Sequence, residues 1–294
     1  MAGLFPSDHC KLRLAPSRSE ATYLEDRLDQ KGAASRILLV DDLAIYRRLV
    51  PVRLGALGRD IDAVCNVDEA RTYLANRKPE LILLDVIMPG VDGLTYCREL
   101  KADPRTRDIP VLMLTDLKGN AHERSLEAGA DDYMPKRIDD ALFRIRVQLH
   151  LHLLELRRRD GGAAVSQEPA SILLATRSPL LKVQLPAQFA QDGHSTRIVD
   201  KLDDVLLATL PQDRLIVLDM DLGIDEMHSA VAQIRMDPAL SGMAVLLLCE
   251  KEELNSLLAI EFMVDDVLWK PLKAQVTRHR LQYLLELARR SFKD

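Results

Sequence analysis

The chain alternates short apolar runs with amphipathic stretches. In its first half, residues 37–40, 81–84 and 111–114 are apolar runs without a polar interruption. Such runs are typical of strands that are buried on both faces of a parallel sheet, where helices cover each side. Between them lie helical patterns such as residues 68–76, which begin with an aspartate and continue with apolar residues at helical spacing. The pattern therefore predicts an α/β fold with a doubly wound parallel sheet.

The same pattern returns in the second half of the chain. Four segments recur there in the same order and at a nearly constant offset, which slips by a single position. Residues 35–40 recur as 170–175, Leu81–Asp85 as 215–219, Val111–Thr115 as 245–249, and 131–136 as 265–270. Four anchors in order indicate an internal repeat. We therefore predict two flavodoxin-like, doubly wound, parallel five-stranded sheets in tandem.

The repeat also sets the expected domain boundaries. The first domain is predicted at residues 35–159 and the second at residues 170–290. Residues 160–169 are small, polar and end in proline, which is typical of a linker. Residues 1–34 precede the first strand and are expected to form a largely unstructured extension.

Composition and charge narrow the function classes. Lys and Arg number 40 against 45 Asp and Glu, which gives a net charge of −5 and argues against a nucleic-acid partner. No apolar run approaches the roughly 20 residues of a membrane span, and the first residues do not resemble a secretory signal. The four cysteines show no metal-type spacing, so we expect a protein of the reducing cytoplasm.

Polar side chains follow the predicted strands of the first copy where each strand ends. Asp41 and Asp42 follow the first strand, Asp85 the third, Thr115 the fourth and Lys136 the fifth. These ends meet at one edge of a parallel sheet, where three carboxylates repel one another unless a cation such as Mg²⁺ neutralises them. A lysine and a hydroxyl beside them can hold phosphoryl oxygens. A single aspartate here could be a helix N-cap, but the whole set predicts phosphoryl transfer to a carboxylate.

Residues 35–158 resemble the receiver domain of response regulators, the module of two-component signalling that has the CheY-like fold. The resemblance is carried by the Asp41 and Asp42 pair, by residues 83–93 (LLDVIMPGVDG), by Thr115 and by residues 131–136 (DDYMPK). It implies a non-enzymatic phosphoprotein that accepts its phosphoryl group from a histidine kinase or a histidine phosphotransfer protein.

The resemblance also assigns roles to single residues. It implies that Asp85 is the phosphoacceptor, and that Asp41, Asp42, Asp85 and the backbone carbonyl of Ile87 hold Mg²⁺. Thr115 and Lys136 would bind the phosphoryl oxygens, and Tyr133 would be the aromatic switch. Arg137 departs from the family, in which proline usually follows the lysine. Ile87 and Leu117 are apolar where they border the approach of water, so slow self-dephosphorylation is expected.

The second copy keeps Asp219 and Lys270 but not the acidic pair. Thr176 and Arg177 replace the two aspartates, and Cys249 replaces the threonine. Without the metal-ligating carboxylates we expect a degenerate pseudo-receiver, an adaptor in which Arg177, Asp219 and Lys270 form a cluster.

A rival interpretation of the second copy is a phosphatase site. Asp219 and Asp221 match the D-x-D motif of haloacid-dehalogenase-type phosphatases. The repeat explains Asp219 without a hydrolase, so we favour the degenerate receiver over a phosphatase.

The helix predicted at residues 139–159 carries two apolar strips. The first comprises Leu142, Ile145, Leu149, His152 and Leu156, and the second Val147, Leu151 and Leu154. One strip could cover the helix's own sheet while the other is left for a partner, or both could form one wide buried face.

The tandem arrangement resembles the input half of PleD-type diguanylate cyclases, in which a receiver and a degenerate receiver precede a GGDEF domain. This resemblance implies dimerisation on phosphorylation. Two functions stay open. The first is a response regulator that acts through a homodimer or a downstream protein partner, and the second is the regulatory input fragment of a cyclase whose GGDEF domain the given chain lacks.

Overall fold

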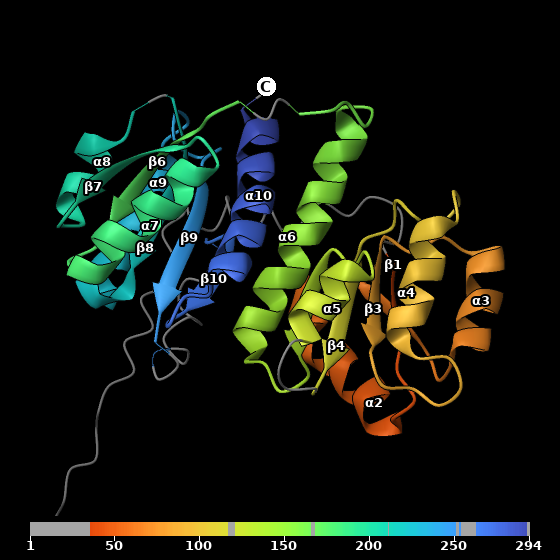
Figure 1. Cartoon of the computed structure of the whole chain (residues 1–294). Helices are drawn as coiled ribbons and strands as arrows, with labels where there is room; N and C mark the ends of the chain where they lie inside the picture. The colour runs from red at the N-terminus through yellow and green to blue at the C-terminus, as the bar shows by residue number, and fades with distance from the viewer. Residues whose placement is uncertain are drawn as a thin grey trace, which may run out of the picture.

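Two parallel five-stranded sheets in tandem, each between layers of helices, make up the computed structural model of the chain (Figure 1). The structure describes residues 36–116, 121–165, 168–210, 212–250, 253 and 263–292. The first sheet has the order β2-β1-β3-β4-β5, and the second has the equivalent order β7-β6-β8-β9-β10. The predicted fold class is thus confirmed. The predicted extension at residues 1–34 lies outside the described residues.

The first copy runs from its first strand to a long closing helix. Its elements are β1 (Arg36–Val40), α2 (Ala44–Arg53), η1 (Gly55–Leu57), β2 (Asp60–Val64), α3 (Val67–Asn76), β3 (Leu81–Asp85), α4 (Gly93–Ala102), β4 (Val111–Thr115), α5 (Ala121–Glu127), β5 (Asp132–Pro135) and α6 (Asp140–Arg159).

The second copy repeats the alternation of strands and helices among its described residues. Its elements are β6 (Ser171–Ala175), α7 (Pro179–Gln191), β7 (Ser195–Val199), α8 (Asp203–Ala208), β8 (Asp213–Asp219), η2 (Met220–Leu222), α9 (Ile224–Met236), β9 (Ala244–Cys249), β10 (Asp266–Trp269) and α10 (Ala274–Ser291). No helix in the described ranges is long and apolar enough to cross a membrane.

The start of α3 differs by one residue from the sequence-based expectation. The helix begins at Val67, because the side chain of Asn66 accepts a hydrogen bond from the backbone N–H of Glu69 at 2.9 Å. Asn66 is therefore the N-cap, and Asp68 lies in the first turn, where its charge is favourable to the helix dipole.

The helix α6 packs against both copies, which bury most residues of its two apolar strips. Leu142 and Ile145 join a buried cluster that contains residues of both sheets, whereas Leu149 and Leu156 join a cluster with Leu281 of α10. The two closing helices α6 and α10 lie side by side between the sheets (Figure 1). Of the two alternatives for this helix, the structure favours the wide buried face, because the second copy of the same chain covers the remaining side.

Charged contacts reinforce this packing at its edge. The guanidinium of Arg157 on α6 donates two hydrogen bonds to Glu286 on α10, at 2.8 and 2.6 Å. Arg290 on α10 contacts Asp160 at 2.9 Å, at the start of the linker. The two copies therefore share one continuous packed interior.

Candidate functional site

Three aspartates meet at the carboxyl ends of β1 and β3. Parallel pairing of these strands places the end of β1 beside the end of β3. One oxygen from each of Asp41, Asp42 and Asp85 lies within 4.8 Å of the others. Asp41 and Asp85 are buried and Asp42 is half-buried. The structure therefore assembles the acidic cluster that the sequence predicts.

Lys136, which follows β5, closes the cluster from the side. Its Nζ lies 2.7 Å from Oδ2 of Asp85 and 2.7 Å from Oδ2 of Asp41. The backbone N–H of Lys136 donates to the carbonyl of Thr115 at 3.1 Å, which ties the ends of β4 and β5 together. Thr115 itself is fully buried at the end of β4.

Burial and pairing compete in the electrostatics of this pocket. Burial raises the pKa of Asp85, although Lys136 opposes the shift. Burial also disfavours the charge of Lys136, but hydrogen bonds to Asp41 and Asp85 outweigh it and raise the pKa of this ammonium group. The lysine is therefore held as a permanent cation beside the carboxylates.

The donor set fits a divalent cation. One lysine faces three carboxylates, so negative charge remains in excess at the cluster. Oδ2 of Asp41 is buried 2.7 Å from the ammonium of Lys136, and a carboxylate oxygen can accept this contact and still bind a metal ion. Carboxylate oxygens with open valences are the ligands that Mg²⁺ prefers.

Gly93 supports the strand end that carries Asp85. A Cβ atom at this position would lie 1.9 Å from the carbonyl oxygen of Asp85 and 2.9 Å from Cα of Val86. The first residue of α4 can therefore approach the backbone of the pocket only as glycine.

We expect Gly93→Ala to lower the free energy of unfolding by about 1–3 kcal/mol, because a methyl group is forced against backbone that cannot rotate away. Urea denaturation measures the loss. Gly55→Ala is the matched control, since a Cβ at Gly55 meets nothing within 4 Å. Equal stability of Gly93→Ala and wild type would show that α4 is not held against Asp85.

The remaining predicted residues of the first copy surround the cluster. Tyr133 is half-buried on β5, and burial raises the pKa of its hydroxyl. The backbone N–H of Ile87 donates to Oδ1 of Asp85 at 3.1 Å, while the side chain of Ile87 is 55% exposed. Leu117 lies outside the described residues. Arg137 points outward, 4.0 Å from Asp116.

Tyr46 is a residue of the pocket that the sequence reasoning missed. Nζ of Lys136 lies 4.2 Å from the centre of the Tyr46 ring, which is a cation–π contact. The hydroxyl of Tyr46 donates to Asp116 at 3.4 Å. The sequence signal that could have identified Tyr46 is its position four residues after Asp42, in the first turn of α2.

In the second copy the equivalent aspartate is fully engaged by protein groups. Oδ1 of Asp219 lies 2.8 Å from Nζ of Lys270, and Oδ2 accepts a hydrogen bond from the hydroxyl of Thr176 at 2.6 Å. The prediction for Arg177 was wrong, because this residue is exposed and its Nε donates to the carbonyl of Asp200 at 3.2 Å. The buried hydroxyl of Thr176 takes the place that we expected for the guanidinium.

The other residues of the degenerate site do not make it reactive. Burial raises the pKa of the Cys249 thiol to about 12, so this side chain stays neutral. Asp221, the second aspartate of the D-x-D motif, pairs with Lys270 at 3.0 Å. Thr176 occupies Oδ2 of Asp219, and within the described residues no group of three acidic side chains that could hold a metal surrounds it, so the geometry does not favour this carboxylate as a nucleophile.

Comparison with known proteins identifies relatives of the first copy. The family model described as the response regulator receiver domain matches residues 37–148. The response regulator PleD of Caulobacter vibrioides is 29% identical over 273 residues, which cover 87% of this chain and 60% of PleD. The phosphate regulon transcriptional regulatory protein PhoB of Pseudomonas aeruginosa is 43% identical over 102 residues, which cover 34% of this chain and 44% of PhoB. The chain thus spans about half the length of these curated relatives.

A solved structure is also similar. The receiver domain of a sensor histidine kinase from Pseudomonas aeruginosa PAO1, which contains a magnesium ion coordinated in its active-site cleft, is 30% identical. The alignment covers 38% of this chain and 93% of that receiver domain, with a TM-score of 0.35. The match to the family model and the strand order agree. Residues 37–148 are therefore a response regulator receiver domain, which the chain carries in tandem with a second copy of the same fold.

Proposed function

We propose that the chain is a cytoplasmic two-component response regulator that accepts a phosphoryl group on Asp85. The observation that carries this proposal is the cluster of Asp41, Asp42 and Asp85 with Lys136 on its edge. In the transfer, a carboxylate oxygen of Asp85 attacks the phosphorus. A P–O bond to Asp85 forms while the bond between phosphorus and the donor breaks. Lys136 and Thr115 hold the phosphoryl oxygens, and Tyr133 responds as the switch.

Mg²⁺ is the proposed cofactor, held by Asp41, Asp42, Asp85 and the backbone carbonyl of Ile87. When bound, it neutralises the charge that develops on the transferring phosphoryl group. Asp41 is fully buried at the centre of this donor set, so we expect this residue to contribute strongly to the affinity for the metal.

We expect Asp41→Asn to weaken Mg²⁺ binding by at least roughly tenfold, since outer-shell changes alone reach that size. Titration calorimetry with Mg²⁺ measures the affinity. Asn retains the acceptor for the backbone N–H of Leu43, at 2.9 Å from Asp41, so the local fold is kept. Asp68→Asn, which is far more exposed, is the control. Undiminished affinity in Asp41→Asn would remove Asp41 from the metal site.

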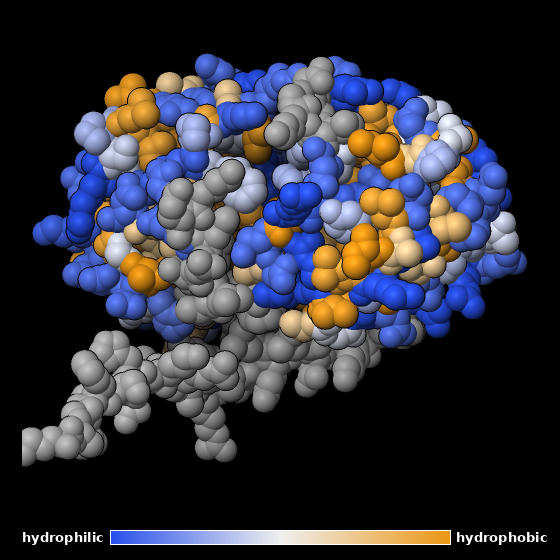
Figure 2. Space-filling model, turned by 90° about the horizontal axis from the view of Figure 1, so that it is seen from below, coloured by the Kyte–Doolittle hydropathy of each residue, from blue (hydrophilic) through white to orange (hydrophobic). Residues whose placement is uncertain are grey.

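The proposed donor is a histidine kinase or a histidine phosphotransfer protein, and the surface beside the pocket suits such a docking partner. Hydrophobic side chains gather on the underside of the first copy, at the place of α2 (Figure 2). This α2 patch comprises Leu43, Ile45, Leu49 and Val52, and Ile87 adds a further exposed side chain at the pocket. An exposed apolar patch of this kind is typical of a protein-binding site.

The second copy is proposed to be an adaptor that accepts no phosphoryl group. Asp219 is occupied by Thr176 and Lys270, and Thr176 and Arg177 supply no carboxylate for a metal. The contacts of α10 with α6 fit a role in transmitting changes from the first copy.

Output is proposed to follow from dimerisation or from binding a downstream protein. Charge added at Asp85 should draw Thr115 and Tyr133 towards the pocket and repack the surface near β4 and β5. We expect beryllofluoride with Mg²⁺ to shift the protein towards a dimer in light scattering at micromolar concentrations. Asp85→Asn is the control that should stay at its original mass. An unchanged wild-type mass would count against dimerisation as the output.

A second candidate function is the input part of a PleD-type diguanylate cyclase. The alignment with PleD runs through both copies and covers 87% of this chain, which favours this candidate over an unrelated output. Sequencing the gene beyond the codon for Asp294 decides it, because a GGDEF domain in the same reading frame is required.

A further inference from the structure

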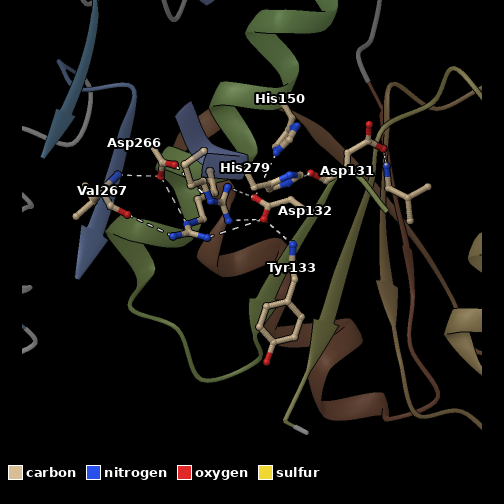
Figure 3. Close-up of polar contacts among 10 residues, drawn as sticks. Asp131, Asp132, Tyr133, His150, Asp266, Val267 and His279 are labelled. Atoms are coloured by element: carbon tan, nitrogen blue, oxygen red, sulfur yellow. Dashed lines mark hydrogen bonds and ion pairs between the residues drawn. The ribbon is translucent and has the colours of Figure 1, made fainter. Parts of the chain in front are cut away.

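A buried group of charges crosses the boundary between the two copies. Asp132, at the start of β5, is fully buried, and both terminal nitrogens of Arg280 on α10 donate to its two oxygens (Figure 3). His150 on α6 adds a contact to Asp132 at 3.3 Å. A carboxylate of the receiver is therefore held by a guanidinium of the second copy.

The arrangement follows the internal repeat. Asp266 is the repeat equivalent of Asp132, and Arg280 is the repeat equivalent of Arg146. Nε of Arg146 lies 3.6 Å from Asp266, and Nε of Arg280 lies 3.6 Å from the other oxygen of Asp266. Each arginine thus faces the aspartate of the opposite copy. We call Asp132, Arg146, Asp266 and Arg280 the interdomain clamp.

The two aspartates of the clamp differ in the hydrogen bonds that they accept from the arginines. Arg146 lies 3.9 Å from Asp132, which already holds Arg280 in two hydrogen bonds. In contrast, Oδ2 of Asp266 and the Nε atoms of both arginines are buried and make no hydrogen bond within the described residues. The two guanidinium groups can therefore be redistributed between the two carboxylates, because Asp266 has unused acceptor capacity.

The clamp also touches β5, the strand that carries Tyr133 and precedes Lys136. The backbone N–H of Tyr133 donates to Oδ1 of Asp132 at 2.5 Å, and Lys136 follows three residues after Tyr133. Asp132 points to the second copy, whereas the Tyr133 side chain extends away from the clamp (Figure 3). A displacement of Asp132 would therefore move β5, which carries the proposed switch residue Tyr133 and leads into Lys136.

We propose that Arg280 is a positioning residue for the acceptor site, through which the second copy restrains loading of Asp85. This inference rests on the proposed function. In the arrangement described here Lys136 binds Asp41 and Asp85, and it has to turn towards the phosphoryl oxygens when Asp85 is loaded. A clamp that fixes β5 in this arrangement opposes that turn. Because coupling between two sites is reciprocal, loading of Asp85 in turn weakens the hydrogen bonds between Arg280 and Asp132.

Two substitutions in the second copy should change the beryllofluoride affinity of the first copy in opposite directions. Arg280→Met releases β5 and is expected to tighten beryllofluoride binding in Mg²⁺ by roughly fivefold, a typical size for coupling between sites. Asp266→Asn leaves both arginines to Asp132 alone and is expected to weaken binding by a similar factor. Arg280→Lys keeps the charge without the bidentate fork, so its affinity should lie between Arg280→Met and wild type.

The experiment titrates beryllofluoride with Mg²⁺ into the full chain by calorimetry. Arg278→Met is the matched control, because Arg278 on the same helix pairs with Asp192 inside the second copy. Trp269 is the single tryptophan of the chain and lies on β10. Its fluorescence therefore reports whether loading of Asp85 in the first copy changes the second copy. Its emission should change on loading in wild type and stay constant in Asp85→Asn.

Opposite shifts in Arg280→Met and Asp266→Asn support the inference, since loss of stability alone would move both affinities the same way. Equal affinities, or shifts of one sign, overturn it. If Arg280→Met does not fold, Asp266→Asn and Arg280→Lys decide alone. Wild type that fails to bind beryllofluoride refutes the proposed function itself. Wild type that binds through Asp85, with unaltered variants, refutes only the role of the clamp.

Discussion

Asp85→Asn is expected to abolish phosphorylation of the chain by acetyl phosphate and Mg²⁺. The amide removes the nucleophilic oxygen charge, while its size leaves the pocket of Asp41 and Lys136 intact. Acetyl phosphate is a suitable donor because it tests the pocket without a kinase. The added phosphoryl mass, measured by mass spectrometry of the intact chain, is the readout.

The matched control is the same substitution at the equivalent position of the second copy. Asp219→Asn should label as wild type does, because Thr176 occupies Oδ2 of this carboxylate and, among the described residues, no group of acidic side chains that could hold a metal surrounds it. Label that persists in Asp85→Asn and maps to Asp219 would contradict the assignment of the second copy as a non-accepting adaptor.

Asp132→Asn is expected to lower the free energy of unfolding by about 3–5 kcal/mol, the range found when one partner of a buried ion pair is removed. Arg280 and Arg146 would then be buried charges beside a neutral amide. Asn keeps the acceptor for the N–H of Tyr133, so the loss reports the charge. Urea denaturation of Asp132→Asn and of wild type measures this loss of stability.

The control for this prediction is an exposed ion pair of the same type. Asp68→Asn, at a side chain that is 89% exposed beside Arg71, should cost less than about 1 kcal/mol. Similar losses in Asp68→Asn and Asp132→Asn would show that burial does not set the strength of the clamp.

The pairing of Asp132 also fixes the sign of a pH effect. Burial disfavours the charge of Asp132, but Arg280, His150 and Arg146 outweigh it and hold the pKa of this carboxyl well below 3.8. The folded protein therefore keeps the charge at a pH where the unfolded chain takes up a proton. The stabilisation is present above 3.8 and is lost as the pH falls through the lower folded value.

The central strands and the acidic cluster could be predicted from the sequence because their signals are local. Residues 37–40 and 81–84 are uninterrupted apolar runs, and the structure buries every one of them. The carboxyl ends of parallel strands necessarily converge, so Asp41 and Asp85 follow from the strand assignment alone. The edge strands β2 and β7 were weaker signals, because they are only partly buried.

The contacts between the copies could not be predicted in the same way. A strip on the helix at residues 139–159 has the same sequence whether another protein or another part of the chain covers it. Arg146 and Arg280 are charged residues in amphipathic helices, a pattern that usually indicates a solvated face. Likewise, the place of Arg177 in the repeat did not reveal that its side chain turns outward to Asp200.

The most direct test of the account is the number and location of phosphoryl groups that one chain accepts. Wild-type protein is incubated with acetyl phosphate and Mg²⁺, weighed intact, and the modified peptide is then mapped. We expect a single phosphoryl group per chain, on Asp85. A second group on Asp219, or a single group at any residue other than Asp85, would contradict it.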